Sequence, residues 1–106
     1  MKSVNTFSLT GRLTADARFF DTKNGKIARF SIAHNFGKGD PALFVDAVIF
    51  PRKGLVIPED LLVKGTPVQI TGYLKPSSNG KDGKTYNSID WVVSSIASAD
   101  EGEDGE

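Results

Sequence analysis

The stretch 42–50, ALFVDAVIF, decides the fold of this sequence. Side chains alternate between the two faces of a β-strand, and this strand would have two unlike faces. One face is small, branched and suited to a hydrophobic core: Leu43, Val45, Ala47 and Ile49. The other face carries two large aromatic residues with a carboxylate between them: Phe44, Asp46, Val48 and Phe50. We therefore predict that one face packs inside the protein and that the other has a different use.

Short extended segments surround this strand along the whole chain. Alternation predicts strands over 4–14, 26–34, 42–50, 66–75 and 85–96, with a short extended piece at 17–21. Gly11 interrupts the apolar face of the first strand, which indicates a bulge or a bend. Asn24-Gly25 predicts a hairpin turn, because both residues tolerate positive φ. The segment 58–64, PEDLLVK, is the one predicted helix, with proline in its first turn and acids at its N-terminal end.

Five strands, a bend in the first and one short helix between the third and the fourth describe a small closed barrel. A barrel removes the exposed edges that an open five-stranded sheet would have to protect. The predicted fold class is therefore all-β, a five-stranded OB-fold barrel. An SH3-like barrel fits less well, because it needs no helix at that position.

Length and composition predict one globular domain. The chain has 106 residues, an apolar content of 39% and a charged content of 25%, values that are usual for such a domain. No apolar run approaches the roughly 18 residues of a membrane span, and MKSVNTFSLT lacks the apolar region of a signal peptide. The absence of cysteine excludes disulfides, thiolate catalysis and cysteine metal sites. We expect no membrane association and a cytoplasmic location.

The formal net charge of zero averages two unlike regions. The last nine residues, SADEGEDGE, contain five acids and no base. Residues 1–97 keep eight Asp and Glu against thirteen Lys and Arg, a net charge near +5. This asymmetry fits an anionic partner and, equally well, a basic surface followed by a solubilising tail. We predict an ordered domain over 1–97 and a disordered acidic tail over 98–106.

The sequence is poorly supplied for catalysis. His34 is the single histidine, and nothing in the sequence places a nucleophile or an orienting acid near it. Zinc or iron sites need more His or Cys than the chain has. NGKDGK lacks the strand–loop–helix frame of a phosphate-binding loop. We therefore predict no enzymatic activity, no metal site and no cofactor, and an enzyme using His34 is the most remote alternative.

The sequence is better supplied for binding a single-stranded nucleic acid. Such proteins combine a basic groove with aromatic faces on which bases stack. Phe44 and Phe50 lie roughly 20 Å apart along one face of a strand, which leaves room for two or three stacked bases. The candidate binding residues are Phe44, Phe50, Tyr73, Phe36, Arg12, Arg29, Arg52, Lys53, Lys75 and Lys84.

Structural roles remain open for several aromatic residues. Phe44 could cover a subunit interface, Phe50 could pack under the helix, and Phe36 could plug the mouth of the barrel. Phe7 and Phe30 lie on the same strand faces as aliphatic residues, which favours the core. Trp91 also shares its face with aliphatic residues, which favours the core or an interface. Phe19 and Phe20 are adjacent, so at most one of them is buried.

The ordered series FSLTGRLTADARFF, NGKIARFSIAHN, LFVDAVIF, LLVKGTPVQITGYLK and KDGKTYNSIDWVV resembles the bacterial-type single-stranded DNA-binding proteins over about residues 5–93. The resemblance implies an OB-fold that binds single-stranded DNA without sequence preference, as a homo-oligomer, with a tetramer favoured over a dimer. It matches Phe44 and Phe50 to stacking aromatics of the third strand and Phe36 to an aromatic after the second. Tyr73 and Lys75 match outward positions of the fourth strand.

Several features depart from the family pattern. PEDLLVK is shorter than the family helix, and PSSNGKDGK lacks an aromatic that the family often has there. The family tail has a long linker and an acidic tip with hydrophobic residues, whereas EGEDGE has no apolar anchor. This argues against recruitment of protein partners through the tail and fits a truncated, phage-like or mobile-element form. The second hypothesis is a primosome-type protein-interaction module that uses the aromatic face as an interface.

Overall fold

The computed structural model describes residues 3–52, 56–76 and 89–99. The strands in these residues are β1 (Phe7–Leu13), β2 (Arg18–Thr22), β3 (Gly25–His34), β4 (Leu43–Ile49), β5 (Pro67–Pro76) and β6 (Ile89–Ser98). A single turn of 3-10 helix, η1 (Glu59–Leu61), lies between β4 and β5.

Five of these strands close into a ring. β1 pairs with β5, β5 with β6, β6 with β4, β4 with β3, and β3 with β1 again. The β4–β6 pairing is parallel and the others are antiparallel. β2 pairs with β3 alone and lies outside the ring. A closed five-stranded barrel with a helical turn between β4 and β5 is the predicted OB-fold, which is confirmed.

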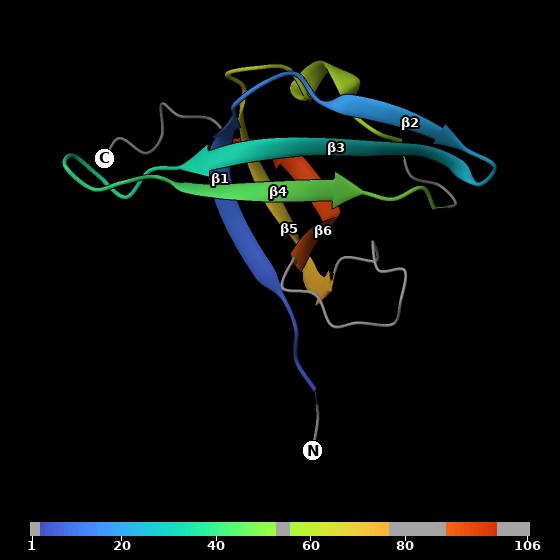
Figure 1. Cartoon of the computed structure of the whole chain (residues 1–106), viewed down its shortest axis with the longest axis horizontal. Coiled ribbons are helices and arrows are strands. Elements are labelled where there is room, and N and C mark those ends of the chain that lie inside the picture. Colours follow the sequence, from blue (N-terminus) through green and yellow to red (C-terminus); the bar gives the residue numbers. More distant parts are fainter. Residues whose placement is uncertain (1–2, 53–55, 77–88, 100–106) are drawn as a thin grey trace, which may run out of the picture.

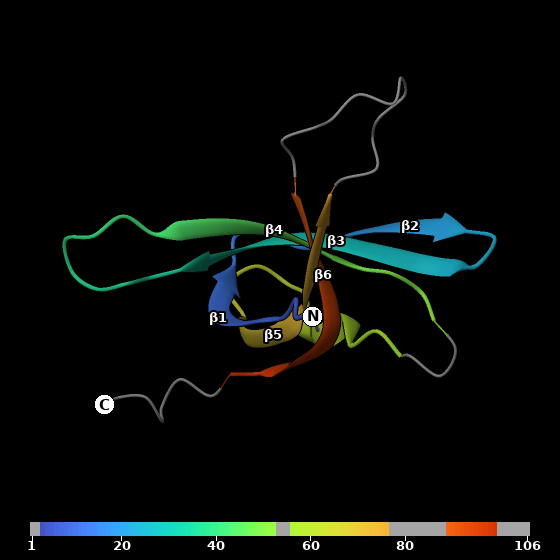
Figure 2. The same ribbon diagram turned by 90° about the horizontal axis from the view of Figure 1, so that it is seen from below.

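The strands β3 and β4 form a long ribbon across the front of the barrel (Figure 1), with β5 and β6 passing behind it. Seen from below, this ribbon extends past the barrel on both sides (Figure 2). One extension carries the loop between β3 and β4, and the other carries the hairpin of β2 and β3. The molecule therefore has a barrel body and two protruding arms.

The barrel interior holds the predicted aliphatic core. The buried cluster comprises Leu13, Ala28, Phe30, Ile32, Val45, Ala47, Ile49, Leu62, Val68, Ile70 and Val93. Phe7 and Trp91 pack against this cluster and meet edge to face, with ring centroids 4.9 Å apart. The predicted core positions of Phe7 and Phe30 are confirmed, and Trp91 proves to be a core residue. Phe19 and Phe20 are both exposed, at 37% and 44%.

Gly11 marks the predicted bend in β1. Residues before it pair with β5 alone, whereas Arg12 and Leu13 also pair with β3. A Cβ on Gly11 would lie 2.6 Å from the carbonyl oxygen of Ala33. The missing side chain therefore lets β1 approach β3 closely enough to close the ring.

The hairpin between β2 and β3 turns one residue earlier than predicted. Thr22 pairs with Gly25, so Lys23 and Asn24 are the turn residues. Gly25 has a φ of 129°, while Asn24 has no positive φ. The Thr22 hydroxyl accepts a hydrogen bond from the Asn24 N–H (3.1 Å) and donates one to the Gly25 carbonyl (2.6 Å), which holds the turn in this register.

The predicted helix over 58–64 is shorter in the structure, where η1 spans Glu59–Leu61. The Leu62 N–H bonds to the Glu59 carbonyl in the 3-10 pattern. The chain then turns away at Gly65 (φ 86°), whose N–H donates to the Leu13 carbonyl. Burial of Leu62 in the core and this contact with β1 end the helix after one turn.

Two residues of β4 differ from the prediction made by alternation. Leu43, placed on the core face, is 39% exposed, because it pairs with His34 in the part of the ribbon that extends past the barrel (Figure 2). Val48, placed on the outer aromatic face, is fully buried. Its neighbours across the sheet are Arg29 of β3 and Val92 of β6, and Val92 is buried as well. The outer face of the sheet therefore contains a small apolar patch.

The ends of the first and last strands also differ from the prediction. β1 covers 7–13 rather than 4–14, and β6 continues to Ser98 rather than ending at residue 96. The Ala99 N–H extends this edge with a hydrogen bond of 3.0 Å to the Pro67 carbonyl. The predicted strand segment 85–88 and the acids of the tail lie outside the described residues.

Candidate nucleic-acid interface

The strand register aligns outward side chains of five strands in one row. From β5 to β2 the row is Tyr73, Val92, Val48, Arg29 and Arg18. Residues paired across neighbouring strands lie on the same side of a sheet. We call this side of β2, β3, β4, β6 and β5 the outer face. It is the side opposite the aliphatic core.

The candidate aromatic residues differ in how they are presented on the outer face. Phe44 is 67% exposed and pairs across the sheet with the small Ala33. Tyr73 is 41% exposed at the β5 end of the row. Phe50 follows β4, is half-buried, and lies under the Lys75 Nζ, which is 5.3 Å from the ring centroid. Exposed ring faces suit base stacking, and Phe44 offers the largest of these three.

Phe36 lies on the loop between β3 and β4 and is 62% exposed. Its ring meets that of His34 edge to face, with centroids 4.9 Å apart. The His34 Nδ1 lies 2.7 Å from the Thr10 carbonyl oxygen, which ties this ring to β1. Phe36 therefore projects from one arm of the ribbon instead of plugging the barrel.

The three candidate arginines are engaged within the protein. Arg12 donates from Nη1 to the Gly65 carbonyl (2.8 Å), and Arg52 donates from Nη2 to the Ser94 carbonyl (2.9 Å). The Arg29 guanidinium lies 3.7 Å from Asp90. The contacts of Arg29 and Arg52 use only part of the five N–H donors of each guanidinium. Their predicted contacts with phosphate are not tested by these bonds, and the candidates Lys53 and Lys84 lie outside the described residues.

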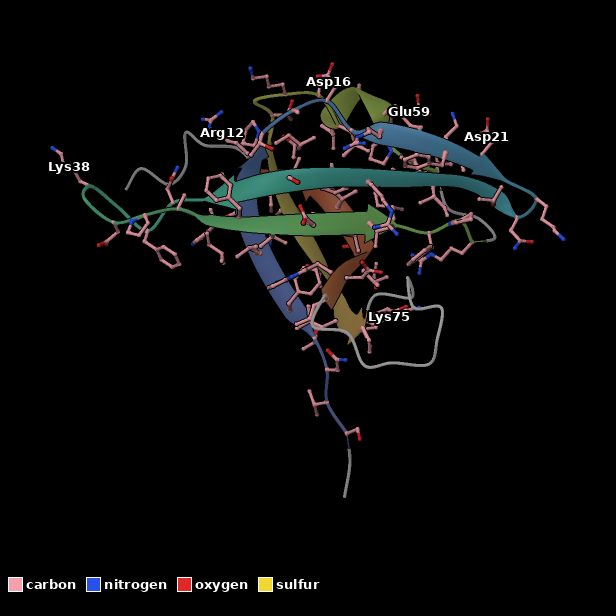
Figure 3. All side chains as sticks on the ribbon, in the orientation of Figure 1. Arg12, Asp16, Asp21, Lys38, Glu59 and Lys75 are labelled. Atoms are coloured by element: carbon pink, nitrogen blue, oxygen red, sulfur yellow. The ribbon has the colours of Figure 1, made fainter. Side chains whose placement is uncertain are left out.

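Basic residues of the described chain lie both within the outer face, at Arg18 and Arg29, and around it. Figure 3 places Arg12 beside the upper end of β1, Lys38 at the tip of the β3–β4 loop, and Lys75 near the lower end of β5. Acids occupy the middle of the face: Asp46 on β4 is exposed, and Asp90 on β6 is 8% exposed. The described part of the outer face therefore carries acidic as well as basic side chains.

A groove of about 420 Å³ opens on the outer face between the β1–β2 loop and the middle of the sheet. Its outward lining combines an aromatic ring, two arginines, a hydroxyl and two acids: Phe20, Arg18, Arg29, Ser31, Asp46 and Asp90. Sequence reasoning missed Phe20 and Arg18. Counting back from the predicted Asn24-Gly25 turn would pair Arg18 with Ser31 instead of Arg29. That register also places Arg18 and Phe20 on the outer face, so the turn was a signal that could have found them.

The described residues contain no group of three or more His, Asp or Glu placed to hold a metal ion. In the same residues no helix is long and apolar enough to cross a membrane.

The model described as "Single-strand binding protein family" matches residues 4–98. The chain belongs to the single-strand binding protein family. Two curated members named "Single-stranded DNA-binding protein" are similar to it. The protein of Treponema pallidum is 32% identical over 103 residues, and that of Borreliella burgdorferi is 36% identical over 85 residues. The alignments cover 91% and 74% of this chain but 58% and 56% of the relatives, so it spans little more than half their length.

Solved structures of family members share the fold. A small single-stranded DNA-binding protein from Streptomyces coelicolor aligns with a TM-score of 0.71 at 21% identity, covering 93% of this chain and 94% of that one. The Plasmodium falciparum protein in its complex with single-stranded DNA aligns with a TM-score of 0.73 at 20% identity, covering 94% and 98%. Both likenesses support the OB-fold of this chain.

Proposed function

We propose that this protein binds and protects single-stranded DNA without an obligatory sequence, during replication, repair or recombination. Binding combines base stacking on the outer face with neutralisation of phosphates by basic residues around it. The protein acts by binding and performs no catalysis. Its family membership, together with the relatives named for single-stranded DNA, supports this function.

The single observation that carries the mechanism is the presentation of Phe44. This ring is 67% exposed, on a strand whose other face packs into the barrel through Val45, Ala47 and Ile49. Leaving a large aromatic in water forgoes the favourable burial of its apolar surface. A stacked base recovers that burial and contributes about 1–3 kcal/mol. Tyr73 and Phe36 extend the stacking surface towards β5 and the ribbon arm, and Phe50 contributes with Lys75 over its ring.

Phosphate contacts fall to basic residues on and around the face, of which Lys53 and Lys84 lie outside the described residues. These basic residues are the candidates Arg12, Arg29, Arg52, Lys53, Lys75 and Lys84. Each neutralised phosphate of a single strand lowers the slope of log affinity against log salt by about 0.7. We expect a moderate salt dependence, since Asp46 and Asp90 reduce the positive potential in the middle of the face.

The test is a fluorescence-anisotropy titration of labelled oligo-dT at several salt concentrations. Wild type binds at low salt and weakens as salt rises. Phe44→Ala weakens binding by about 1–3 kcal/mol, or about 5- to 150-fold. Phe19→Ala is the matched control, because Phe19 is 37% exposed but pairs with the core-facing Ala28 on the opposite side of the sheet. That control retains wild-type affinity.

Failure of wild type to bind oligo-dT even at low salt would contradict the proposed function. The primosome-type alternative predicts a different result for the same variant. If Phe44 covers a protein interface, Phe44→Ala changes the mass of the assembly and leaves oligo-dT binding intact. Light scattering on both proteins separates the two roles.

We further propose a homo-oligomer, with a tetramer favoured over a dimer. Within the described residues, β1 pairs with β5 along one edge, while its other edge meets β3 only at Arg12 and Leu13. Among the described residues, the edge from Phe7 to Leu9 has no second strand beside it, and open edges favour pairing between chains. Sedimentation equilibrium measures the mass; a monomer at all concentrations contradicts the proposal.

The proposed DNA partner implies that the protein acts in the cytoplasm. The proposed domain spans residues 1–97 and is followed by an acidic tail at 98–106, whose acids can compete with DNA for basic side chains.

A further inference from the structure

The carboxylate of Asp46 lies in the middle of a surface expected to attract polyanions. It shares the outer side of β4 with Phe44, two residues before it, at a spacing of about 7 Å along the strand. Asp46 is exposed, and it lines the groove on the outer face. Repulsion of phosphate at this position would weaken binding unless the groove receives another part of the nucleic acid.

The local charges disfavour the phosphate backbone beside Asp46. Three acids line it against two arginines: Asp16, Asp46 and Asp90 against Arg18 and Arg29. Arg29 lies 3.7 Å from Asp90, and Asp16 accepts the backbone N–H of Lys64 at 2.8 Å. Asp46 has no such cationic or amide partner among the described residues. Among the three acids of the groove, Asp46 is therefore the one whose charge is most available to an incoming ligand.

A hydrogen bond fixes the orientation of the Asp46 carboxylate. The Ser31 hydroxyl of β3 donates to Oδ1 at 2.7 Å, and Ser31 and Asp46 are paired across the sheet. Within the described part of the chain, Ser31 is the only hydrogen-bond partner of Asp46. The second oxygen, Oδ2, remains free to accept hydrogen bonds from a ligand. An oriented, exposed acceptor is what recognition of a base edge requires.

We infer that Asp46 reads the edge of a base stacked on Phe44 and favours bases that carry an exocyclic amino group. Cytosine, adenine and guanine each present an amino donor to a carboxylate. Thymine and uracil present a single N3–H donor between two carbonyl oxygens. The lone pairs of these oxygens repel the carboxylate. This inference rests on the proposed function and adds a base preference to stacking that is otherwise tolerant of sequence.

The test compares oligo-dC with oligo-dU, each about 16 nucleotides long, by anisotropy at neutral pH. The two pyrimidines differ only at ring positions 3 and 4, so size and methyl contacts are matched. Wild type binds oligo-dC at least about fivefold more tightly than oligo-dU. Asp46→Asn keeps the size of the side chain and adds a donor. It brings the affinity ratio close to one and raises affinity for oligo-dU, since a negative charge is lost.

Two further variants separate base reading from charge and folding. Asp21→Asn removes the same charge from an exposed residue at the far end of β2 (Figure 3) and leaves the ratio at its wild-type value. Ser31→Ala removes the bond that orients Asp46 and gives an intermediate ratio. Thermal melts of all variants establish that they are folded.

Equal affinities of wild type for the two oligonucleotides, or an unchanged ratio in Asp46→Asn, would overturn the inference while leaving the proposed function standing. Failure of both oligonucleotides to bind would overturn the proposed function, and the inference with it.

Discussion

The two ends of β4 carry the same kind of residue on the same face, yet the structure treats them differently. Phe44 at one end is 67% exposed, beside the small Ala33. Phe50, just past the other end, is half-buried with the Lys75 ammonium over its ring. Alternation along a strand assigns a face, whereas neighbouring strands decide how much of that face a ligand reaches. We therefore expect the Phe44 end to dominate stacking and the Phe50 end to combine packing with phosphate binding.

The largest loss of free energy of unfolding is expected for a substitution at Val48, which lies between these two ends. This residue points outward but is fully buried against a sheet neighbour that is also valine. Val48→Ala should lower the free energy of unfolding by about 2 kcal/mol, since it removes buried methyl groups and leaves a cavity. Chemical denaturation measures the loss. An unchanged stability would show that the patch on the outer face is accessible and available to DNA.

Arg29→Gln should lower the free energy of unfolding by about 1 kcal/mol. The change leaves the Asp90 carboxylate, which is 8% exposed, without its cationic partner. Lys26→Gln is the matched control, because it breaks an ion pair with Glu59 in which both side chains are well exposed. Exposed ion pairs of this kind contribute little to the free energy of unfolding. Equal losses in the two variants would contradict a supporting role for Arg29 beneath the stacking surface.

Phe50→Ala should cost less than about 1 kcal/mol in oligo-dT binding, at the low end of the range for a stacked base. The reason is that its ring is half-buried and already in contact with Lys75. Anisotropy under the conditions used for Phe44→Ala gives the comparison. A loss as large as that of Phe44→Ala would remove the distinction between the two ends of β4.

The smallest effect is expected for Lys75→Gln, which should change the salt dependence of oligo-dT binding. Loss of one phosphate contact should make the slope of log affinity against log salt shallower by about 0.7. Lys26→Gln should leave the slope unchanged, because Lys26 shares the core side of β3 with Ala28 and pairs with Glu59. The same slope for wild type and Lys75→Gln would mean that this ammonium serves the Phe50 ring alone.

The barrel could be predicted from the sequence because its evidence is local. Period-2 alternation, a glycine on an apolar face and an Asn-Gly turn each report backbone geometry within a few residues. Val45, Ala47 and Ile49 are buried as this pattern predicts. Leu43 follows the same pattern but lies beyond the barrel, where no other strand covers it. The reach of a ribbon past a barrel depends on the closure of distant strands.

The chemistry of the outer face could be predicted only in part. Alternation placed Phe44 and Asp46 together, and both are exposed. It could not show that Arg12, Arg29 and Arg52 bond to Gly65, Asp90 and Ser94, since these partners are at least 42 residues away in the sequence. Such pairings depend on which strands become neighbours. They place each of these arginines against a carbonyl or a carboxylate of the protein itself.

The most direct test of the account replaces each aromatic in turn by a fluorescent reporter. Trp91 is the only tryptophan and packs edge to face with Phe7 in the core, so it supplies a constant background. On saturation with oligo-dT, Phe44→Trp should show strong stacking-induced quenching beyond that of wild type, and Phe50→Trp should show distinctly less. If anisotropy shows that oligo-dT is bound while Phe44→Trp is quenched no more than wild type, DNA does not stack at this end of β4 and the account is wrong.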